Sequence, residues 1–248
     1  GSMSIEDFRK VQDSILSEQK AKNEKTFSEQ VDEALQPNNQ NQYSALKVCD
    51  TTQILLDVGC QQLPMLYTQK HLREAIHPKS KDNIHWHGLT TEQIKKLPEL
   101  LENPVMIFDS LSRNDSLVIC VLDTDEDNLP LIVSIKPNGI GTYELEKVDS
   151  NFITSVYGRS NFEKHIEQVV HQDKMLYCNK QKSQELFRVS GLQLPKCLNN
   201  LDFDIIIHRS RNIVNENIVE EKHTSEEQLS FDNINSDKES RKPNEQKG

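Results

Sequence analysis

The chain has 248 residues, a formal net charge of −10 and five cysteines. The negative charge excludes a protein that binds nucleic acid through a long basic groove, so any contact with RNA or DNA requires a small cationic pocket. The cysteines are far apart and form no C-x-x-C pair, which is typical of reduced thiols in a cytosolic protein. No apolar run has the length of a membrane span, and we therefore expect a soluble protein without membrane contact.

The N-terminal region, residues 1–43, is polar and is expected to lie outside the main domain. Its first two residues resemble the remnant of an expression tag. Residues 4–35 predict a polar helix, because apolar positions such as Phe8 and Val11 recur at helical spacing. Residues 37–42 are rich in asparagine and glutamine and predict a linker.

Three short helices are expected before any sheet. Thr51, Thr68 and Thr90 each precede an apolar stripe of helical period, and threonine is suited to accept a hydrogen bond from the first turn of a helix. Gln93 stands three residues after Thr90 and completes a capping box. A polar loop over residues 79–87 separates the second of these helices from the third.

Apolar runs rich in β-branched residues follow and predict strands. A tight turn over residues 137–141 favours antiparallel pairing of the strands that it joins. Helices followed by a strand meander, with one further helix late in the chain, indicate a single α+β domain over residues 44–210. We expect a small antiparallel sheet of about four strands, at residues 105–108, 116–122, 131–136 and 152–157, with a last or edge strand at residues 174–179.

The C-terminal end loses this apolar pattern from about residue 212. Glutamate, asparagine, serine, aspartate and lysine dominate it. Such a composition buries too little apolar surface to offset the entropy lost on ordering the chain. We therefore expect residues 211–248 to form a disordered acidic tail.

The stretch Val148–Arg159 combines an apolar strand centre with polar residues that a core strand does not need. Side chains alternate along a strand, so an unbroken strand places Asn151, Ser155, Tyr157 and Arg159 on one face. Lys136 adds a cation in the preceding run. A face of hydroxyls and cations is suited to a phosphate-bearing ligand, although a half-exposed strand with ordinary polar residues explains the same pattern.

Several kinds of catalytic site find no support in the sequence. His77, His85 and His87 could offer three nitrogens to a metal ion, but neither an H-E-x-x-H helix nor an acidic cluster accompanies them, so we expect no metal and no cofactor. The chain has no G-x-S-x-G turn and no glycine-rich phosphate loop. Metal-free RNA cleavage remains, because it requires only a proton-transferring group, often histidine, and cations that stabilise the charged transition state.

An ordered series of motifs resembles the phage MuF C-terminal domain. The series covers most of residues 46–195 and comprises Leu63–Leu66, Lys70–Leu72, His87–Leu89, Leu97–Pro98, Asn103–Pro104, Asn151, Thr154–Arg159, Leu176–Tyr177, Asn179–Lys180 and Gly191–Pro195. The resemblance implies a barnase–EndoU–colicin–RelE-like nuclease fold. It also implies a polymorphic toxin of temperate phages and mobile elements.

The resemblance carries over the polar residues His71, His87, Lys136, Asn151, Ser155, Tyr157 and Arg159 but does not fix their roles. We expect His71 to act as general acid or base, with His87 as its partner. Lys136 and Arg159 are expected to neutralise the phosphate that Ser155 and Tyr157 orient. The expected site consists of the catalytic residues His71, His87, Lys136, Ser155 and Tyr157 and the substrate-binding residues Arg73, Asn151 and Arg159.

We therefore expect a metal-independent ribonuclease toxin that acts on RNA, with tRNA as one candidate, in the bacterial cytoplasm. Delivery by a phage and inhibition by a cognate immunity protein follow from the resemblance. The alternative is a non-catalytic module of nuclease fold that binds a phage or host protein, and a weaker third option is a metal-dependent DNA nuclease. Convergence of His71 or His87 with the polar strand residues would favour the ribonuclease.

Overall fold

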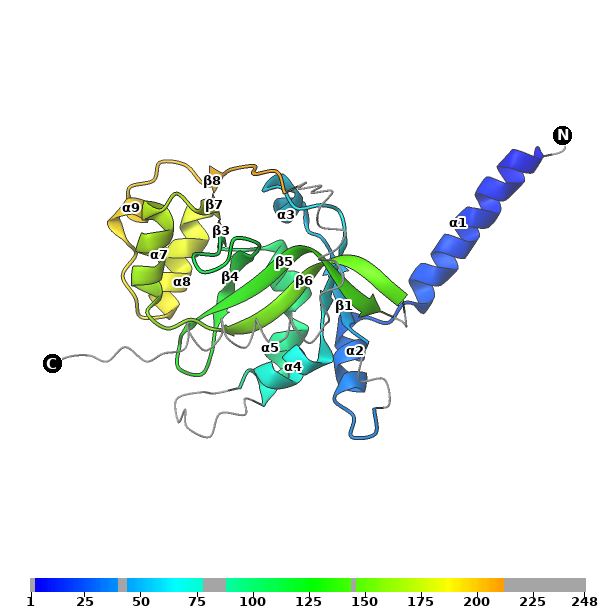
Figure 1. Ribbon diagram of the computed structural model, residues 1–248, viewed down its shortest axis with the longest axis horizontal. Helices are drawn as coiled ribbons and strands as arrows, with labels where there is room; N and C mark the ends of the chain where they lie inside the picture. Colours follow the sequence, from blue (N-terminus) through cyan, green and yellow to red (C-terminus); the bar gives the residue numbers. More distant parts are fainter. Residues whose placement is uncertain (1–2, 40–43, 78–87, 144–145, 212–248) are drawn as a thin grey trace.

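The computed structural model describes residues 3–39, 44–77, 88–143 and 146–211, in which helices pack on both faces of one sheet (Figure 1). The helices are α1 Ile5–Asn23, α2 Phe27–Ala34, α3 Gln53–Asp57, α4 Gln69–Ile76, α5 Thr91–Lys95, α6 Leu97–Glu102, α7 Phe162–His171, α8 Lys180–Val189 and α9 Lys196–Asn199. The strands are β1 Leu46–Asp50, β2 Pro64–Tyr67, β3 Met106–Asp109, β4 Leu117–Thr124, β5 Pro130–Tyr143, β6 Glu146–Gly158, β7 Met175–Cys178 and β8 Ile205–Ile206.

The sheet corrects the predicted fold class, although the α+β description holds. It has eight strands in the order β1-β2-β6-β5-β4-β3-β7-β8, so the small antiparallel sheet of about four strands is wrong. It is also mixed, because β2 pairs with β6 in parallel while the other strand pairs of the described residues are antiparallel. The strands β1 and β2 are only 5 and 4 residues long, and short runs of this kind give little periodicity to detect.

Both faces of the sheet are buried over its centre, because β4 carries apolar side chains on each side. Leu117, Ile119 and Val121 belong to a first core, closed by α2, α4, α5 and α6. Val118 and Cys120 belong to a second core, closed by α7 and α8. Figure 1 shows α2, α4 and α5 along the lower side of the sheet and α7, α8 and α9 gathered at its left-hand end.

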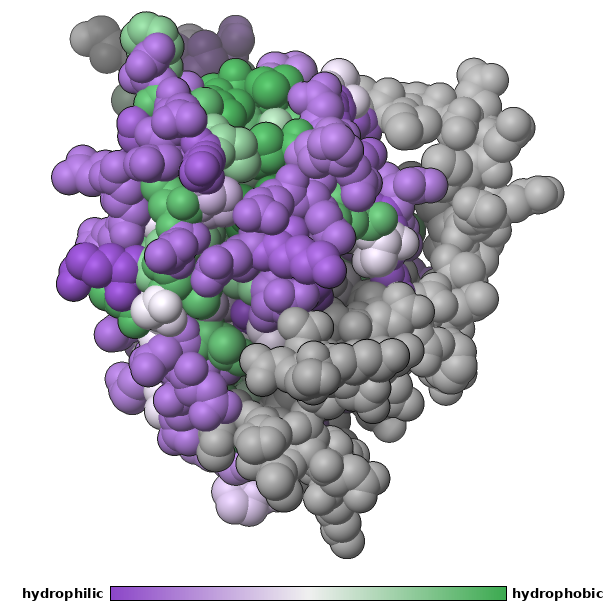
Figure 2. Space-filling model, turned by 90° about the vertical axis from the view of Figure 1, so that its left-hand side faces the viewer, coloured by the Kyte–Doolittle hydropathy of each residue, from purple (hydrophilic) through white to green (hydrophobic). Residues whose placement is uncertain are grey.

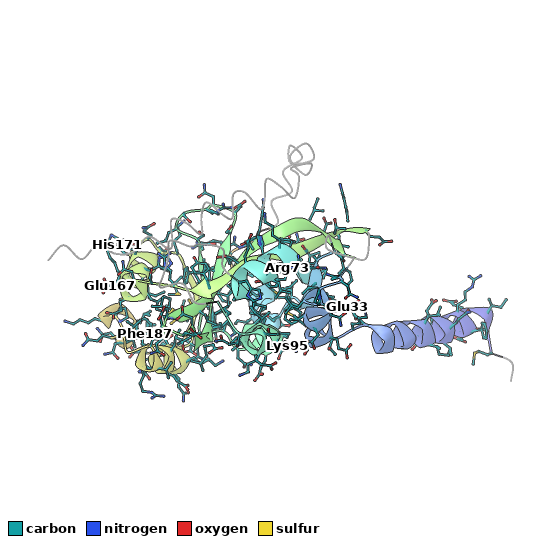
Figure 3. All side chains as sticks on the ribbon, turned by 90° about the horizontal axis from the view of Figure 1, so that it is seen from below. Glu33, Arg73, Lys95, Glu167, His171 and Phe187 are labelled. Atoms are coloured by element: carbon teal, nitrogen blue, oxygen red, sulfur yellow. The ribbon has the colours of Figure 1, made fainter. Side chains whose placement is uncertain are left out.

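The predicted N-terminal helix is in fact two helices. Thr26 caps α2, where its side chain accepts a hydrogen bond from the N–H of Glu29 at 3.2 Å. Val31 is completely buried in the first core, and the Gln30 side chain exchanges hydrogen bonds with the backbone of Lys47 in β1. The preceding helix, α1, extends away from the domain (Figures 1 and 3).

The long hairpin of β5 and β6 replaces the predicted tight turn at residues 137–141. The backbone continues as strand to Tyr143, and a register shift between Lys136 and Gly139 absorbs the irregular Pro-Asn-Gly sequence. A second shift changes the faces of β6. Ser155 lies opposite Ser134 and Ile153 lies opposite Ile135, so one extra residue forms a β-bulge.

The bulge overturns the prediction that the odd-numbered polar residues share one face. Ile153 and Val156, three residues apart, both belong to the first core, whereas an unbroken strand would place them on opposite sides. Tyr157 belongs to the second core. Ser155 and its partner Ser134 therefore face the side of the sheet that carries the second core. Asn151, which precedes the bulge, faces the side that carries the first core, as Ile153 does.

A C-terminal strap, residues 205–211, joins the β7 edge of the sheet to α3. The N–H of Ile207 donates to the carbonyl of Leu176 at 2.7 Å, and the N–H of Arg209 donates to the carbonyl of Val58 at 3.1 Å. Both Arg209 and Arg211 form ion pairs with the carboxylate of Asp109 at the end of β3. The acidic tail predicted after this strap lies outside the described residues from residue 212 on.

Candidate functional site

A polar patch lies on β5 and β6, on the face of the sheet that also carries the second core. It consists of Ser134, Lys136 and Ser155. Ser134 and Ser155 are direct cross-strand partners, and Lys136 projects to the same side two residues further along β5. The patch therefore has one ammonium group and two hydroxyl groups on the same face of the sheet, and Ser155 is only 8% exposed.

An acidic neighbour reduces the charge of this patch. The Nζ atom of Lys136 lies 3.4 Å from a carboxylate oxygen of Asp115, and the two side chains are 30% and 55% exposed. An ion pair in this setting is screened by water and contributes at most about 1 kcal/mol. An anionic ligand can therefore compete for the ammonium group of Lys136.

The predicted ligand-orienting residue Tyr157 lies next to the patch along β6. It is buried in the second core and lies opposite Ile132. The structure thus brings Lys136, Ser155 and Tyr157 to one face of the sheet.

Arg159 follows at the end of β6 and contacts a histidine that the sequence analysis did not select. Its Nη2 atom lies 3.4 Å from Nδ1 of His165 on α7. Burial, and secondarily the charge of Arg159, lowers the pKa of His165 to about 3, so the imidazole is neutral and its Nδ1 accepts the hydrogen bond. The ring of His165 packs edge-on against Phe108 at a centroid distance of 5.5 Å.

His71 is not brought to the polar patch. It lies on α4, whose Leu72 and Ala75 pack into the first core on the opposite face of the sheet. Its side chain is buried, and burial together with the charge of Lys70 lowers its pKa to about 4. Its backbone also has structural partners, since its N–H donates to Thr68 and its carbonyl accepts from the hydroxyl of Tyr67.

Asn151 and Arg73 also lie apart from the patch, in structural positions. The Asn151 amide donates to the hydroxyl of Thr51 at 2.8 Å and to the carbonyl of Gln61 at 2.9 Å, which ties β6 to the region around α3. Arg73 donates to the carbonyl of Ala34 at 3.4 Å. Figure 3 shows Arg73 among the helices near Glu33, far from Glu167 and His171 on α7.

Residues 78–185 match the family model of the phage MuF C-terminal domain. We call these residues the MuF-like segment. They include the polar patch, Tyr157, Arg159 and His165, whereas His71 and Arg73 precede them. No curated protein and no solved structure matches the chain. The match confirms the phage-domain resemblance for this part of the chain.

The MuF-like segment begins with residues that the structure does not describe. His85 and His87 lie in that part, so the prediction that His87 works beside the patch is outside the described residues. Among the residues that are described, no group of three or more His, Cys, Asp or Glu side chains is placed to hold a metal ion. Nor does any described helix have the length and apolarity that crossing a bilayer requires.

His165 was missed because its signal is weak in the sequence. It lies on α7 between Phe162 and Ile166, both buried in the second core, and a single polar residue on a buried helix face gives no motif. His165 is only six residues after Arg159 in the chain. Their contact depends, however, on the change of chain direction at Asn161, directly before α7, where φ is positive at 53°. Such a backbone turn is not evident from residue types alone.

Proposed function

We propose that the MuF-like segment is a metal-independent endoribonuclease of the phage-toxin type, with RNA bound on the polar patch. The observation that supports this proposal best is the cross-strand pair Ser134 and Ser155 beside Lys136. An ammonium group and hydroxyl donors on a rigid sheet are suited to hold a phosphodiester and to stabilise the negative charge that grows during its cleavage.

The proposed reaction is an internal transesterification. The ribose 2′-oxygen bonds to the neighbouring phosphorus, the bond from phosphorus to the 5′-oxygen breaks, and a 2′,3′-cyclic phosphate and a 5′-hydroxyl result. A base removes the proton of the 2′-hydroxyl and an acid protonates the leaving 5′-oxygen. Lys136 would stabilise the phosphorane charge, and Ser155 would orient a phosphate oxygen.

Proton transfer is assigned to His87 rather than to His71. His71 is buried on the far side of the sheet, and with a pKa near 4 it is a weak base and an ineffective proton donor at neutral pH. His87 belongs to the MuF-like segment, and histidine is the side chain most often used for proton transfer in catalysis. A ribonuclease of this kind would act on bacterial RNA, with tRNA as one candidate, and would require an inhibitor protein in the cell that makes it.

A second candidate is a non-catalytic module that binds a phage or host protein. The separation of His71 from the polar patch favours it, because a catalytic pair of His71 and Ser155 is not assembled.

Purified protein incubated with total RNA or tRNA in EDTA distinguishes the two candidates. The ribonuclease proposal requires cleavage products that end in 2′,3′-cyclic phosphate. Lys136→Ala should lower the cleavage rate by roughly a hundredfold. Lys147→Ala, at an exposed position of β6 in the same hairpin, is the matched control and should cleave at the wild-type rate.

The absence of cleavage would exclude the ribonuclease and leave the binding module, provided that the protein is folded by circular dichroism. Cleavage of DNA that appears only when a divalent metal is added would instead support the metal-dependent nuclease.

A further inference from the structure

A pocket of about 490 Å³ lies where β6 ends and α7 begins. Its lining includes the apolar side chains of Leu129, Phe162 and Leu192 together with Arg159 and Glu163. Figure 2 shows the end of the molecule that carries α7, where apolar side chains lie exposed among polar ones. The pocket is lined by both apolar and charged side chains, which is the usual composition of a small-ligand site.

The charges that line the pocket do not favour a phosphate group as its ligand. Arg159 and Lys164 line it together with Glu163 and Glu167, so two cations face two carboxylates and no excess of positive charge is offered to an anion. A flat, uncharged ring with N–H groups at its edge is suited to this balance. The carboxylates accept from such N–H groups, the apolar side chains contact the ring, and a guanidinium plane stacks on its face.

Arg159 is the side chain in this lining that has a planar cationic group for such a stacking contact. Only one edge of its guanidinium group has a hydrogen-bond partner in the described part of the chain. Its Nη2 donates to Nδ1 of His165, while its Nε is buried and makes no hydrogen bond in the described part of the chain. A buried donor without a partner is costly, and Nε gains a partner only if the guanidinium group shifts when a ligand binds. His165 therefore acts as a positioning residue for Arg159.

The pocket is close enough to the polar patch to serve the same ligand. Arg159 follows Ser155 by four residues, which spans about 13 Å along an extended strand. Phe162 of the pocket and Tyr157, which lies next to the patch, belong to the same second core, so the pocket and the patch are on the same side of the sheet. An RNA strand of a few nucleotides is long enough to span the distance between them.

We propose that this pocket is a nucleobase subsite, in which Arg159, positioned by His165, stacks on one base of an RNA whose backbone lies on the polar patch. The inference rests on the proposed ribonuclease function and adds to it a site that recognises a base rather than a phosphate. Unlike a phosphate site, it makes binding depend on the presence of a base at a particular nucleotide.

The test measures the affinity of the full chain for two short fluorescent oligonucleotides by anisotropy. Both carry 2′-O-methyl groups, which prevent attack by the 2′-oxygen, and only one of them carries bases. Wild-type protein should bind the base-bearing strand about tenfold more tightly than the abasic strand. Arg159→Leu should abolish this preference, whereas Arg188→Leu, which removes the same charge from an exposed site on α8, should retain it.

Two further variants separate the positioning role from a purely structural one. His165→Asn keeps an acceptor for Arg159 and should retain the base preference. His165→Leu fills the space without an acceptor and should lose the preference, although both proteins fold. Lys136→Ala should weaken the binding of both strands by the same factor.

The outcomes distinguish the subsite from the function on which it rests. A wild-type preference near one, or a preference that Arg159→Leu leaves unchanged, overturns the subsite even if RNA is cleaved. A base preference that depends on Arg159, in a protein that cleaves no RNA in EDTA, supports the subsite and overturns the ribonuclease. Failure to bind either strand overturns the subsite, and the cleavage assay in EDTA then decides the ribonuclease by itself.

Discussion

Ser155 lies directly opposite Ser134 in the β5–β6 ladder, while Ile153, only two residues earlier, lies opposite the adjacent Ile135. Thr154 is therefore the extra residue of the bulge. Its hydroxyl donates to the carbonyl of Ser134 at 3.2 Å, which fixes the bulge against the neighbouring strand. The composition of the polar patch depends on this one inserted residue, because the insertion decides which side chains of β6 face Lys136.

Deletion of Thr154 should disrupt the sheet. Without the inserted residue, the side chains on one side of it along β6 turn to the opposite face of the sheet. Apolar side chains would then face away from the first core, and polar side chains would enter it. We expect a loss of several kcal/mol in the free energy of unfolding, measured by urea denaturation. Thr154→Val is the control, since it keeps the bulge, loses one hydrogen bond and should cost about 1 kcal/mol. Equal losses for both changes would show that the bulge has no special importance.

The parts of the structure that the sequence predicted correctly depend on local chemistry. Thr68 caps α4, and Thr90 with Gln93 forms the complete capping box at α5, because each of these bonds joins residues three positions apart. Thr51 is the exception. Thr52 takes the cap position of α3, and the hydroxyl of Thr51 donates instead to the carbonyl of Leu63 at 2.6 Å.

The errors concern relationships between distant residues. Met65 of β2 lies beside Asn151 of β6, which is 86 positions later in the chain. No local sequence pattern indicates this parallel pairing. The bulge at Thr154 has no glycine or proline to mark it, since threonine suits a regular strand as well. The sequence offered one guide to the faces of the site residues, namely that side chains alternate along a regular strand. The single inserted residue in β6 interrupts that alternation and made the prediction wrong.

His71 should affect the pH dependence of stability. Its pKa is about 4 in the folded protein and about 6.5 when exposed. The unfolded chain therefore binds a proton that the folded protein excludes, so stability is highest above pH 6.5 and falls as the pH drops toward 4, by up to about 3 kcal/mol. His71→Gln should remove this share of the acid destabilisation, measured by urea unfolding at neutral and mildly acidic pH.

The same variant tests the position of His71 relative to the chemistry. His77→Gln, at the exposed end of α4, is the control and should leave the pH profile as in the wild type. His165 retains its own lowered pKa in both variants, so some acid sensitivity persists. If the wild-type protein has the proposed ribonuclease activity, folded His71→Gln protein should cleave RNA at the same rate at neutral pH, and a large loss of cleavage would show that His71 belongs to the catalytic site.

Asp109 should be the principal electrostatic attachment of the C-terminal strap. Its carboxylate is 15% exposed and pairs with Arg211, which is 13% exposed, and with Arg209 at 2.7 Å. Asp109→Asn leaves two guanidinium groups without their counter-charge and should cost about 2–3 kcal/mol. Asp115→Asn breaks the ion pair with Lys136, which is more exposed than the pairs of Asp109, and should cost less than about 1 kcal/mol. Similar costs for the two variants would argue against an electrostatic attachment of the strap.

Gly59 should be required for the strap to lie across α3. Its φ is +114°, and a Cβ at this position would overlap with the carbonyl oxygen of Arg209, a backbone atom that cannot move aside without displacing the strap. Gly59→Ala should therefore destabilise the protein by more than about 2 kcal/mol and release the amides of Ile207 and Arg209 to hydrogen exchange.

Gly191 offers a matched control for this substitution. It too has a positive φ, +67°, but a Cβ there would meet no atom within 4 Å. Gly191→Ala should thus cost only the conformational strain, about 1 kcal/mol, and leave the exchange of the strap amides unchanged. If the two variants had the same effect, the strain of the positive φ alone would account for both, and the contact between Gly59 and the strap would contribute nothing to stability.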